Sequence, residues 1–434
     1  MKKFNSIIVC FLTASFLLTG TASAKDIFVS PSGDDSISYA ENDIDHPWES
    51  VEKAFTNVQA GDNVYFRTGD YSISSTIETK YGVNGTNAAP ITFSNYSDDS
   101  VTFTSSVNRA IYIDRNYYHI SGINFSAPGT FWYIGKTYDA INFELSDCEG
   151  EITAAGGGEN LGCVRFHYTT ANNGRIENCK FVGPGPNENI NTAGIFVFRA
   201  QGIKILHCEF SNLPRAVYYK HTCIPEDTGI EFAYNYFYQN GTGIATVSQY
   251  AEIHNNLFVD GGLLTGFDGG TGDDGNNAGS DHNNIYNNTF YNCTIDLIRQ
   301  SSNDGSGAQY NIIKNNIFTN TINIFQYESA PHYTIMDYNL YNNEVAIRNN
   351  RTNYSLSSWQ AFYKQDEHSL AGTPKFISDA PSVIEDYSLD DSSIAKNSGS
   401  SGKDMGADIS QVTKCGPSSN LPVIVLEISE KQNL

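Results

Sequence analysis

The chain has 434 residues, a formal net charge of -22 at pH 7 and 13% aromatic residues. Its length would accommodate two ordinary domains. The strong negative charge argues against nucleic acid or an anionic membrane as a partner, because both would repel an acidic protein.

The segment 1–24 has the features of a secretory signal peptide. Lys2 and Lys3 precede an apolar run from Ile7 to Leu18, and Ala22-Ser-Ala24 supplies a cleavage site. We therefore expect cleavage after Ala24 and a secreted or periplasmic protein. No later segment is apolar over enough residues to span a bilayer, so we expect no membrane span.

Residues 25–110 are predicted to form an N-terminal cap and the first strands. Asp26 to Gly33 has the pattern of a strand and turn. Apolar residues at helical spacing between Trp48 and Val58 predict a short amphipathic helix. Further strands are expected at Val101–Phe103 and Ala110–Ile113. The helix would cover core side chains and strand edges that an open end exposes.

One short pattern recurs at intervals of about 20 to 30 residues. Each copy has an apolar residue first, Asn or Cys fourth and an aromatic residue sixth, as in Ile253-His-Asn-Asn-Leu-Phe258. Each copy is too short for a helix and is read as a strand followed by a turn. Stacked copies, about 4.8 Å apart, would bury a continuous core. The fourth positions, where stacked amides are expected to bond along the stack and to tolerate a left-handed bend, are Cys179, Cys208, Asn235, Asn256, Asn288, Asn316 and Asn339.

This ladder resembles the right-handed parallel β-helix proteins, a superfamily rich in polysaccharide lyases of the pectate, alginate and chondroitin lyase types. The resemblance covers most of the mature chain. It implies a single all-β solenoid with a short N-terminal capping helix, with repeats at 111–375 and a C-terminal cap and tail at 376–434. Trp359 and Phe362 are expected to pack in a second cap.

Cysteines occupy three successive rungs of the ladder. Cys148, Cys179 and Cys208 share the column that later copies fill with Asn. We expect them to be buried thiols, although stacked neighbours would be close enough for a disulfide bond. No cysteine and histidine spacing in the chain suggests a zinc site.

Each coil has a second predicted strand after the Asn turn. Alternation of side chains places every second residue of these strands on an outer face. The residues expected to point inward are Val164, Ile195, Val217, Ile244, Leu264, Leu297 and Ile324. The resulting outer face is rich in aromatic residues, which suit stacking against sugar rings. The predicted substrate-binding residues are Phe196, Phe198, Arg165, Phe267, Gln300 and Tyr327. Two alternatives remain: a loop covers this face as a second core, or the alignment slips by one residue.

Lys220 lies in the middle of this face, where neighbouring aromatic residues would lower its pKa by desolvation. Cleavage of a uronic acid polymer by β-elimination needs a base and a cation that neutralises the carboxylate. Lys220 or His221 is the predicted base. The other predicted catalytic residues are Arg199 or Arg215 for the carboxylate, Tyr218 as the acid for the leaving oxygen, and His167 nearby. The alternative is that Lys220 is an ordinary solvated lysine.

A glycine-rich acidic insertion is predicted to bind calcium near the same face. Carboxylate oxygens are the ligands that calcium prefers, and glycines allow a tight wrap. Calcium would also bridge an acidic protein to an acidic polymer. The predicted ligands are Asp268, Asp273, Asp274 and Asp281. The alternative is a solvated loop.

The chain departs from the motifs of the individual enzyme families. It lacks the Lys-Ser-Ser and Arg-His-Gly motifs of the alginate and chondroitin lyases, and of the polygalacturonase motifs it has only Asp273-Asp274. We predict an exported, monomeric lyase that acts on a uronic acid polysaccharide. The alternatives are a non-catalytic carbohydrate-binding or adhesion protein, and a glycoside hydrolase that uses Asp carboxylates.

Overall fold

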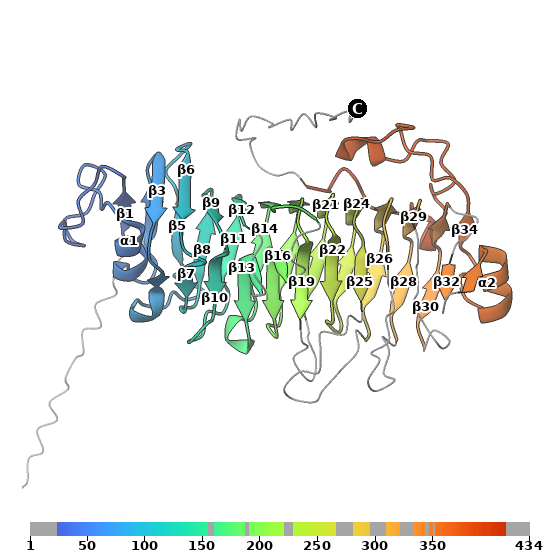
Figure 1. Ribbon diagram of the computed structural model, residues 1–434, viewed down its shortest axis with the longest axis horizontal. Coiled ribbons are helices and arrows are strands. Elements are labelled where there is room, and N and C mark those ends of the chain that lie inside the picture. The colour runs from blue at the N-terminus through green and yellow to red at the C-terminus, as the bar shows by residue number, and fades with distance from the viewer. Residues whose placement is uncertain are drawn as a thin grey trace, which may run out of the picture.

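The computed structural model describes residues 24–154, 160–186, 191–220, 229–265, 281–295, 310–321, 333–342, 347–349 and 352–413. Within them, three long sheets with exclusively parallel pairing run side by side along one elongated stack (Figure 1). From β2 to β25 the chain passes through each sheet once per coil, so each of these coils adds one strand to each sheet. This is a parallel β-helix, as predicted.

Sheet A has twelve strands in the described residues. They are β1 (Asp26–Val29), β2 (Asn63–Phe66), β5 (Ile91–Asn95), β8 (Tyr118–Ser121), β11 (Glu144–Ser146), β14 (Arg175–Glu177), β17 (Lys204–Leu206), β20 (Glu231–Ala233), β23 (Glu252–His254), β26 (Asn284–Tyr286), β28 (Ile312–Lys314) and β30 (Ile335–Asp337).

Sheet B also has twelve strands in this part of the chain. They are β3 (Gly69–Ile73), β6 (Val101–Ser105), β9 (Asn124–Ala127), β12 (Glu149–Ile152), β15 (Lys180–Val182), β18 (Glu209–Ser211), β21 (Tyr236–Tyr238), β24 (Leu257–Val259), β27 (Thr289–Tyr291), β29 (Ile317–Thr319), β31 (Leu340–Tyr341) and β34 (Leu370–Ala371).

Sheet C has eight strands among the described residues. They are β4 (Ile77–Glu78), β7 (Arg109–Ile113), β10 (Thr130–Ile134), β13 (Leu161–His167), β16 (Thr192–Phe198), β19 (Arg215–Lys220), β22 (Thr242–Thr246) and β25 (Leu263–Thr265). A separate antiparallel pair joins β32 (Ile347–Asn349) to β33 (Thr352–Tyr354).

Each repeat of the sequence pattern forms two short strands, not one strand followed by a turn. Its first residues end a strand of sheet A and its last residues begin a strand of sheet B, as in β23 and β24. The left-handed residue between them is the third of the pattern, for example Asn255 at φ 53° and Asn287 at φ 53°. The fourth residue therefore does not adopt the left-handed conformation, which corrects the prediction.

The fourth-position asparagines form the predicted ladder inside the bend. Asn256 donates its side-chain amide to the Asn288 Oδ1 atom at 3.0 Å, and Asn288 donates to Asn316 at 3.1 Å. Each of these oxygens also accepts the backbone N–H of the preceding rung. The Asn288 Oδ1 atom, for example, accepts the Asn256 N–H at 3.0 Å. Asn235, Asn256 and Asn288 are 0% exposed, so this ladder satisfies backbone groups that water does not reach.

Aromatic rings at the sixth position stack in the interior. Phe237, Phe258 and Phe290 lie with successive ring centroids 4.6 and 4.7 Å apart and nearly parallel planes. The cysteines of the earlier rungs are buried, and Cys148, Cys179 and Cys208 carry free thiols. The prediction of buried thiols is confirmed for these three residues.

Helix α1 (Val51–Asn57) lies at the N-terminal end of the stack (Figure 1). Ser50 caps it by accepting the Lys53 N–H at 3.1 Å. Its Phe55 ring stacks on Phe93 of β5 at 4.1 Å, with an angle of 1° between the planes. The helix therefore covers core side chains at this end, as predicted.

Helix α2 (Leu356–Tyr363) lies at the other end, where Trp359 is fully buried. Phe362 is 71% exposed, so only half of the predicted second aromatic cap is correct. Beyond it, residues 376–412 return along the outside of sheet B. Met405 and Ile409 of this segment share a second apolar cluster with Leu257 and Ile317. Three-residue helical turns complete the described elements: η1 (Thr79–Tyr81), η2 (Thr169–Ala171) and η4 (Ser400–Gly402), with η3 (Ile384–Tyr387) one residue longer.

Among the described residues, no helix is both long enough and apolar enough to cross a membrane.

Candidate functional site

The outer face of sheet C carries three of the side chains that were predicted to bind substrate, Arg165, Phe196 and Phe198, which are the ones in the described part of the chain. Parallel pairing aligns Arg165, Phe196 and Tyr218 in one row across β13, β16 and β19. It aligns His167, Phe198 and Lys220 in a second row on the same strands. The residues that alternate with them along the strands include Val164, Ile195 and Val217, and these belong to the interior core. The predicted side-chain alternation is therefore correct for these coils.

The alignment fails by one residue at the last strand of the sheet. Ile244 of β22 pairs with Leu263 of β25, and Leu263 is fully buried in the core. Leu264 was predicted to occupy that position. A slip of one residue reverses the side of the residues that follow on that strand. Phe267 lies beyond the described residues, so its outward orientation stays a prediction.

The predicted exposure of the central rings is wrong. Phe196 and Tyr218 are 0% and 1% exposed, and their rings meet edge to face at 5.1 Å. Together with Ala193 and Ala245 they form a small cluster outside the main core. The alternative of a second core is thus correct for this row. Phe198, in the second row, is only partly buried.

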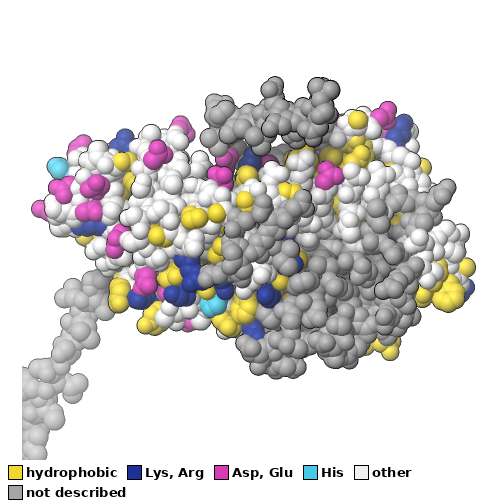
Figure 2. Space-filling view, in the orientation of Figure 1, with side chains coloured by type: hydrophobic (Ala, Val, Ile, Leu, Met, Phe, Trp, Pro, Cys, Tyr) yellow, Lys and Arg dark blue, Asp and Glu magenta, His cyan; other side chains and the backbone are white. Residues whose placement is uncertain are grey.

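Cations lie on both sides of these rings. The Arg165 guanidinium carbon is 4.8 Å from the Tyr133 ring centroid and 5.2 Å from that of Phe196. Arg215 lies 4.0 Å from the Tyr218 ring, and the Lys220 Nζ atom lies 5.9 Å from the same ring. Dark-blue side chains gather with a cyan histidine on the lower part of the molecule (Figure 2).

Lys220 is the last residue of β19 and is partly buried. Burial lowers its pKa below the usual value of 10.5, and the charges of Arg215 and Arg165 lower this pKa further. The positive charge of an ammonium is disfavoured both by removal from water and by nearby cations. These conditions increase the fraction of Lys220 that is neutral and able to accept a proton.

His167 lies with Tyr133 rather than with Lys220. Its Nδ1 atom is 3.3 Å from the Tyr133 hydroxyl, and its ring stacks 5.9 Å from Phe198. Two strand steps separate it from Lys220. Burial lowers the pKa of His167 to about 4, with further lowering by the charges of Arg165, Arg109 and Lys136.

Arg199 follows the end of β16 and has a left-handed backbone, with φ 59°. Its guanidinium lies 5.6 Å from the Phe198 ring and 5.7 Å from the Tyr168 ring. The strand has therefore ended at this residue, as the predicted role of Arg199 required. Arg215, by contrast, is 7% exposed and lies beside Lys220 on the face itself.

Several predicted residues lie outside the described part of the chain. They are His221, Phe267, Gln300, Tyr327, Asp268, Asp273 and Asp274. Asp281 is described, and its backbone carbonyl accepts the Tyr250 N–H at 3.1 Å. The described residues contain no group of three or more His, Cys, Asp or Glu side chains that could hold a metal ion. Calcium binding at the four aspartates stays a prediction.

Sequence reasoning missed four residues at the N-terminal side of this face. Tyr112 and Tyr133 extend the row of Arg165 across β7 and β10. Arg109 lies 5.9 Å from the Tyr133 ring, and Lys136 lies 4.0 Å from the Tyr112 ring. Extending the same alternation two coils upstream from Val164 would have found the tyrosines.

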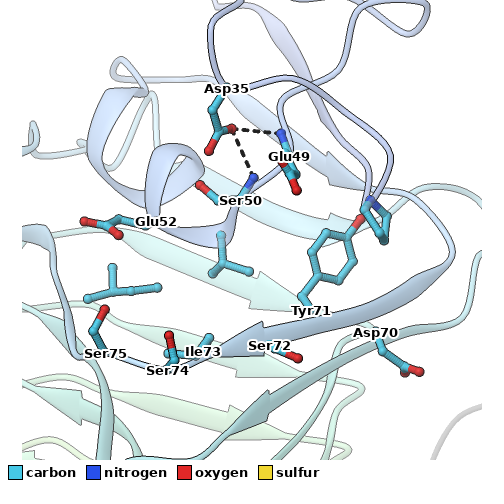
Figure 3. Close-up of a pocket in the computed structure, with 13 residues that line it drawn as sticks. Asp35, Glu49, Ser50, Glu52, Asp70, Tyr71, Ser72, Ile73, Ser74 and Ser75 are labelled. Atoms are coloured by element: carbon cyan, nitrogen blue, oxygen red, sulfur yellow. Dashed lines mark hydrogen bonds between the residues drawn. The ribbon is translucent and has the colours of Figure 1, made fainter.

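A separate pocket of about 460 Å³ lies beside α1. Asp35 accepts the backbone N–H groups of Glu49 and Ser50 there, at 2.8 and 3.1 Å. The carboxylates of Glu52 and Asp70 point to opposite sides (Figure 3). This acidic lining would repel an anionic ligand, whereas the cations on the outer face of sheet C would attract one.

Residues 27–182 match the family described as the Pel9A-like, right handed beta helix region. The pectate lyase PEL9 of Emericella nidulans is 39% identical over 79 residues, and the match spans 18% of each protein. The crystal structure of pectate lyase Pel9A aligns with a TM-score of 0.49 at 14% identity, covering 89% of this chain and 96% of that one. The complex structure of XylC with xylose aligns with a TM-score of 0.50 at 10% identity, covering 81% and 87%.

The matched family region ends at the last residue of β15, so it includes sheet C only as far as β13. Identities near 10% support a shared fold and do not extend to activity. Together with three parallel sheets and the asparagine ladder, the family match and the XylC alignment identify the chain as a right-handed parallel β-helix protein whose residues 27–182 are similar to the Pel9A-like family.

Proposed function

We propose that this protein is an exported polysaccharide lyase that cleaves a uronic acid polymer by β-elimination on the outer face of sheet C. One observation carries the proposal: Lys220, with a lowered pKa, shares this face with Arg215 and Arg165 in a protein whose net charge is -22. The names of the matched Pel9A-like family and of the pectate lyase PEL9 support this class of substrate.

The proposed reaction uses neutral Lys220 as the base. It takes the proton from the carbon beside the carboxylate, the electron pair forms a carbon–carbon double bond, and the bond to the glycosidic oxygen breaks. Arg215 and Arg165 stabilise the negative charge that develops on the carboxylate. His221 is the alternative base, and Arg199 is an alternative partner of the carboxylate.

The leaving oxygen needs a proton to complete the reaction. Tyr218 is too buried, at 1% exposed, to approach that oxygen in this conformation. We therefore assign the return of the proton to Lys220 itself, which carries the abstracted proton on the same face. Calcium bound by Asp268, Asp273, Asp274 and Asp281 is a further proposal, which a chelator can test.

The test is incubation of the purified protein with pectate, alginate and chondroitin, with and without calcium or a chelator. Absorbance of an unsaturated product supports the lyase. New reducing ends without unsaturation would instead indicate a glycoside hydrolase, and retention on the polymer with neither product would indicate a binding or adhesion protein. The same assay of Lys220→Ala tests the proposed base. Lys180→Ala is its matched control, because Lys180 lies on β15 of sheet B and pairs there with Glu209 at 3.6 Å.

A further inference from the structure

One strand edge at the N-terminal end of the stack has no neighbouring strand among the described residues. β1, β3 and β4 are the terminal strands of sheets A, B and C. The edge of β1 is closed, because the Asn42 side chain accepts the Phe28 N–H at 2.8 Å and donates to the Phe28 carbonyl at 2.9 Å. Helix α1 contacts β4. The outer edge of β3 instead borders the pocket of about 460 Å³ that lies beside α1.

The backbone groups of β3 point alternately towards β6 and towards this pocket. The Gly69 N–H and the Ile73 carbonyl form hydrogen bonds with the chain at the two ends of β6, at 3.0 and 3.1 Å. Alternate residues of a parallel strand bond to opposite sides, so the N–H and C=O groups of Asp70 and Ser72 point away from β6. Neither residue has a hydrogen bond to another described residue on that side. Unpaired backbone groups along a strand edge are a template for a further strand.

The charge around this edge is negative. Glu49, Glu52 and Asp70 line the pocket and are exposed, and their carboxylates form no hydrogen bond or ion pair with another described residue. No Lys, Arg or His is among the described residues that line it. Glu52 and Asp70 lie on opposite sides of the pocket (Figure 3). A ligand that pairs with the edge of β3 would therefore meet acidic groups on both sides.

We propose that the outer edge of β3 binds an extended basic peptide, which adds a strand to sheet B. The peptide backbone pairs with the N–H and C=O groups of Asp70 and Ser72, and such main-chain pairing supplies most of the affinity in strand addition. Lysine or arginine side chains near both ends of the peptide meet the carboxylates of Glu52 and Asp70. β3 has five residues, so a peptide of about five residues, roughly 17 Å long when extended, matches this edge. The inference is independent of the lyase activity.

Two other occupants of this edge match its charge less well. A second copy that paired through the same edge would bring two acidic pockets together, and like charges disfavour such a contact. Residues 421–430 of the chain itself are rich in branched apolar residues, but they include Glu427 and Glu430 and no Lys or Arg. A basic peptide is attracted by the same carboxylates that disfavour these two occupants.

The experiment measures the fluorescence anisotropy of labelled peptides of about six residues as the purified protein is added. The basic probe alternates valine and lysine, and the acidic probe has glutamate in place of each lysine. Ser72→Pro removes the outward N–H of β3 and places a ring at the edge, whereas its control, Ser72→Ala, keeps that N–H. Glu52→Gln with Asp70→Asn removes two charges at the pocket. The matched control is Glu367→Gln with Asp379→Asn, which removes two exposed charges in the chain beyond α2.

We expect the wild-type protein to bind the basic probe about 10-fold or more tightly than the acidic probe. Ser72→Pro should weaken binding of the basic probe by about 10-fold or more, because backbone pairing is lost. Removal of the two carboxylates should weaken it by about 3- to 10-fold, since exposed ion pairs are weak, and both controls should stay within about 2-fold of wild type.

Three results would overturn the inference: no binding of the basic probe, equal binding of both probes, or unchanged binding by folded Ser72→Pro. A wild-type dimer that Ser72→Pro abolishes would also overturn it, in favour of a second copy at this edge. Circular dichroism checks the fold of each variant. If Ser72→Pro does not fold, methylation of alternate backbone nitrogens of the basic probe tests the same pairing on wild-type protein, and unchanged binding in both methylation registers would overturn the inference.

Discussion

Each cation on the outer face of sheet C lies against an aromatic ring. Arg215 is 4.0 Å from Tyr218, and Arg165 lies between Tyr133 and Phe196. A cation over a ring contributes about 0.5–2 kcal/mol, depending on how much water is excluded. These contacts offset part of the repulsion among the cations, which is why the cations can share one face. Burial, and then the charges of Arg215 and Arg165, lower the pKa of Lys220 there.

The pH dependence of activity tests Lys220 as the base. Its pKa lies below the usual 10.5, so the neutral amine becomes available at lower pH than for an ordinary lysine. We expect kcat/KM for the lyase reaction to rise with pH and to level off below pH 10.5. In Lys220→Arg the guanidinium stays protonated, and we expect a loss of about 100-fold or more at every pH. A variant that retained the wild-type profile would contradict the assignment.

His167 should make stability depend on pH in a defined window. Its pKa is about 4 in the folded protein and near 6.5 when unfolded, so the unfolded state binds the extra proton first as pH falls. Stability should therefore decrease from pH 6.5 to pH 4, by about 1–2 kcal/mol once solvent screening is considered. Urea unfolding should show a smaller decrease for His167→Gln. An equal decrease in both proteins would show that other groups are responsible.

At the scale of the elements, the bend between sheets A and B determines how coils stack. The ladder could be predicted because its first, fourth and sixth positions each serve one purpose in every coil: core, amide ladder and ring stack. The left-handed conformation of the third position could not be predicted, because different residue types occupy it. They include Asn178, His207, Tyr234 and Asn255. No residue type marks the bend, and the sequence pattern therefore predicts one strand per repeat where the structure has two.

Asn288 should be among the residues that contribute most to this bend. Its amide donates to the Ile253 carbonyl at 2.8 Å, and its oxygen accepts the Asn256 N–H at 3.0 Å. Asn288→Ala would leave these buried groups without partners, and we expect a loss of about 2–4 kcal/mol in the free energy of unfolding. Asn284→Ala is the control, since it removes only a partly exposed bond to Glu252. Similar losses in urea titrations of both variants would refute the importance of the ladder.

Across the whole molecule, positive charge collects on one face of an acidic protein. The outward orientation of Lys220 followed from strand alternation, which needs only local sequence. The burial of Phe196 and Tyr218 and the grouping of Arg109 and Lys136 with Arg165 depend on contacts between coils. Residues far apart in sequence make those contacts, so sequence reasoning missed them.

This charge distribution predicts how salt affects polymer binding. Raising the ionic strength from about 50 to about 500 mM should weaken binding of pectate or alginate by Lys220→Ala, because screening reduces attraction to the basic face. If the net charge of the whole protein dominated, the same increase would strengthen binding by screening repulsion. Retention on immobilised polymer at graded salt distinguishes the two signs.

The most direct test of the central claim is the initial rate at which unsaturated product forms in Lys220→Ala. General base catalysis contributes typically about 100- to 10,000-fold, and we expect a loss in that range. Lys180→Ala, on the outer face of sheet B, should stay within about 2-fold of wild type. A folded Lys220→Ala protein that forms the product at the wild-type rate would contradict the claim that cleavage takes place on the basic face of sheet C.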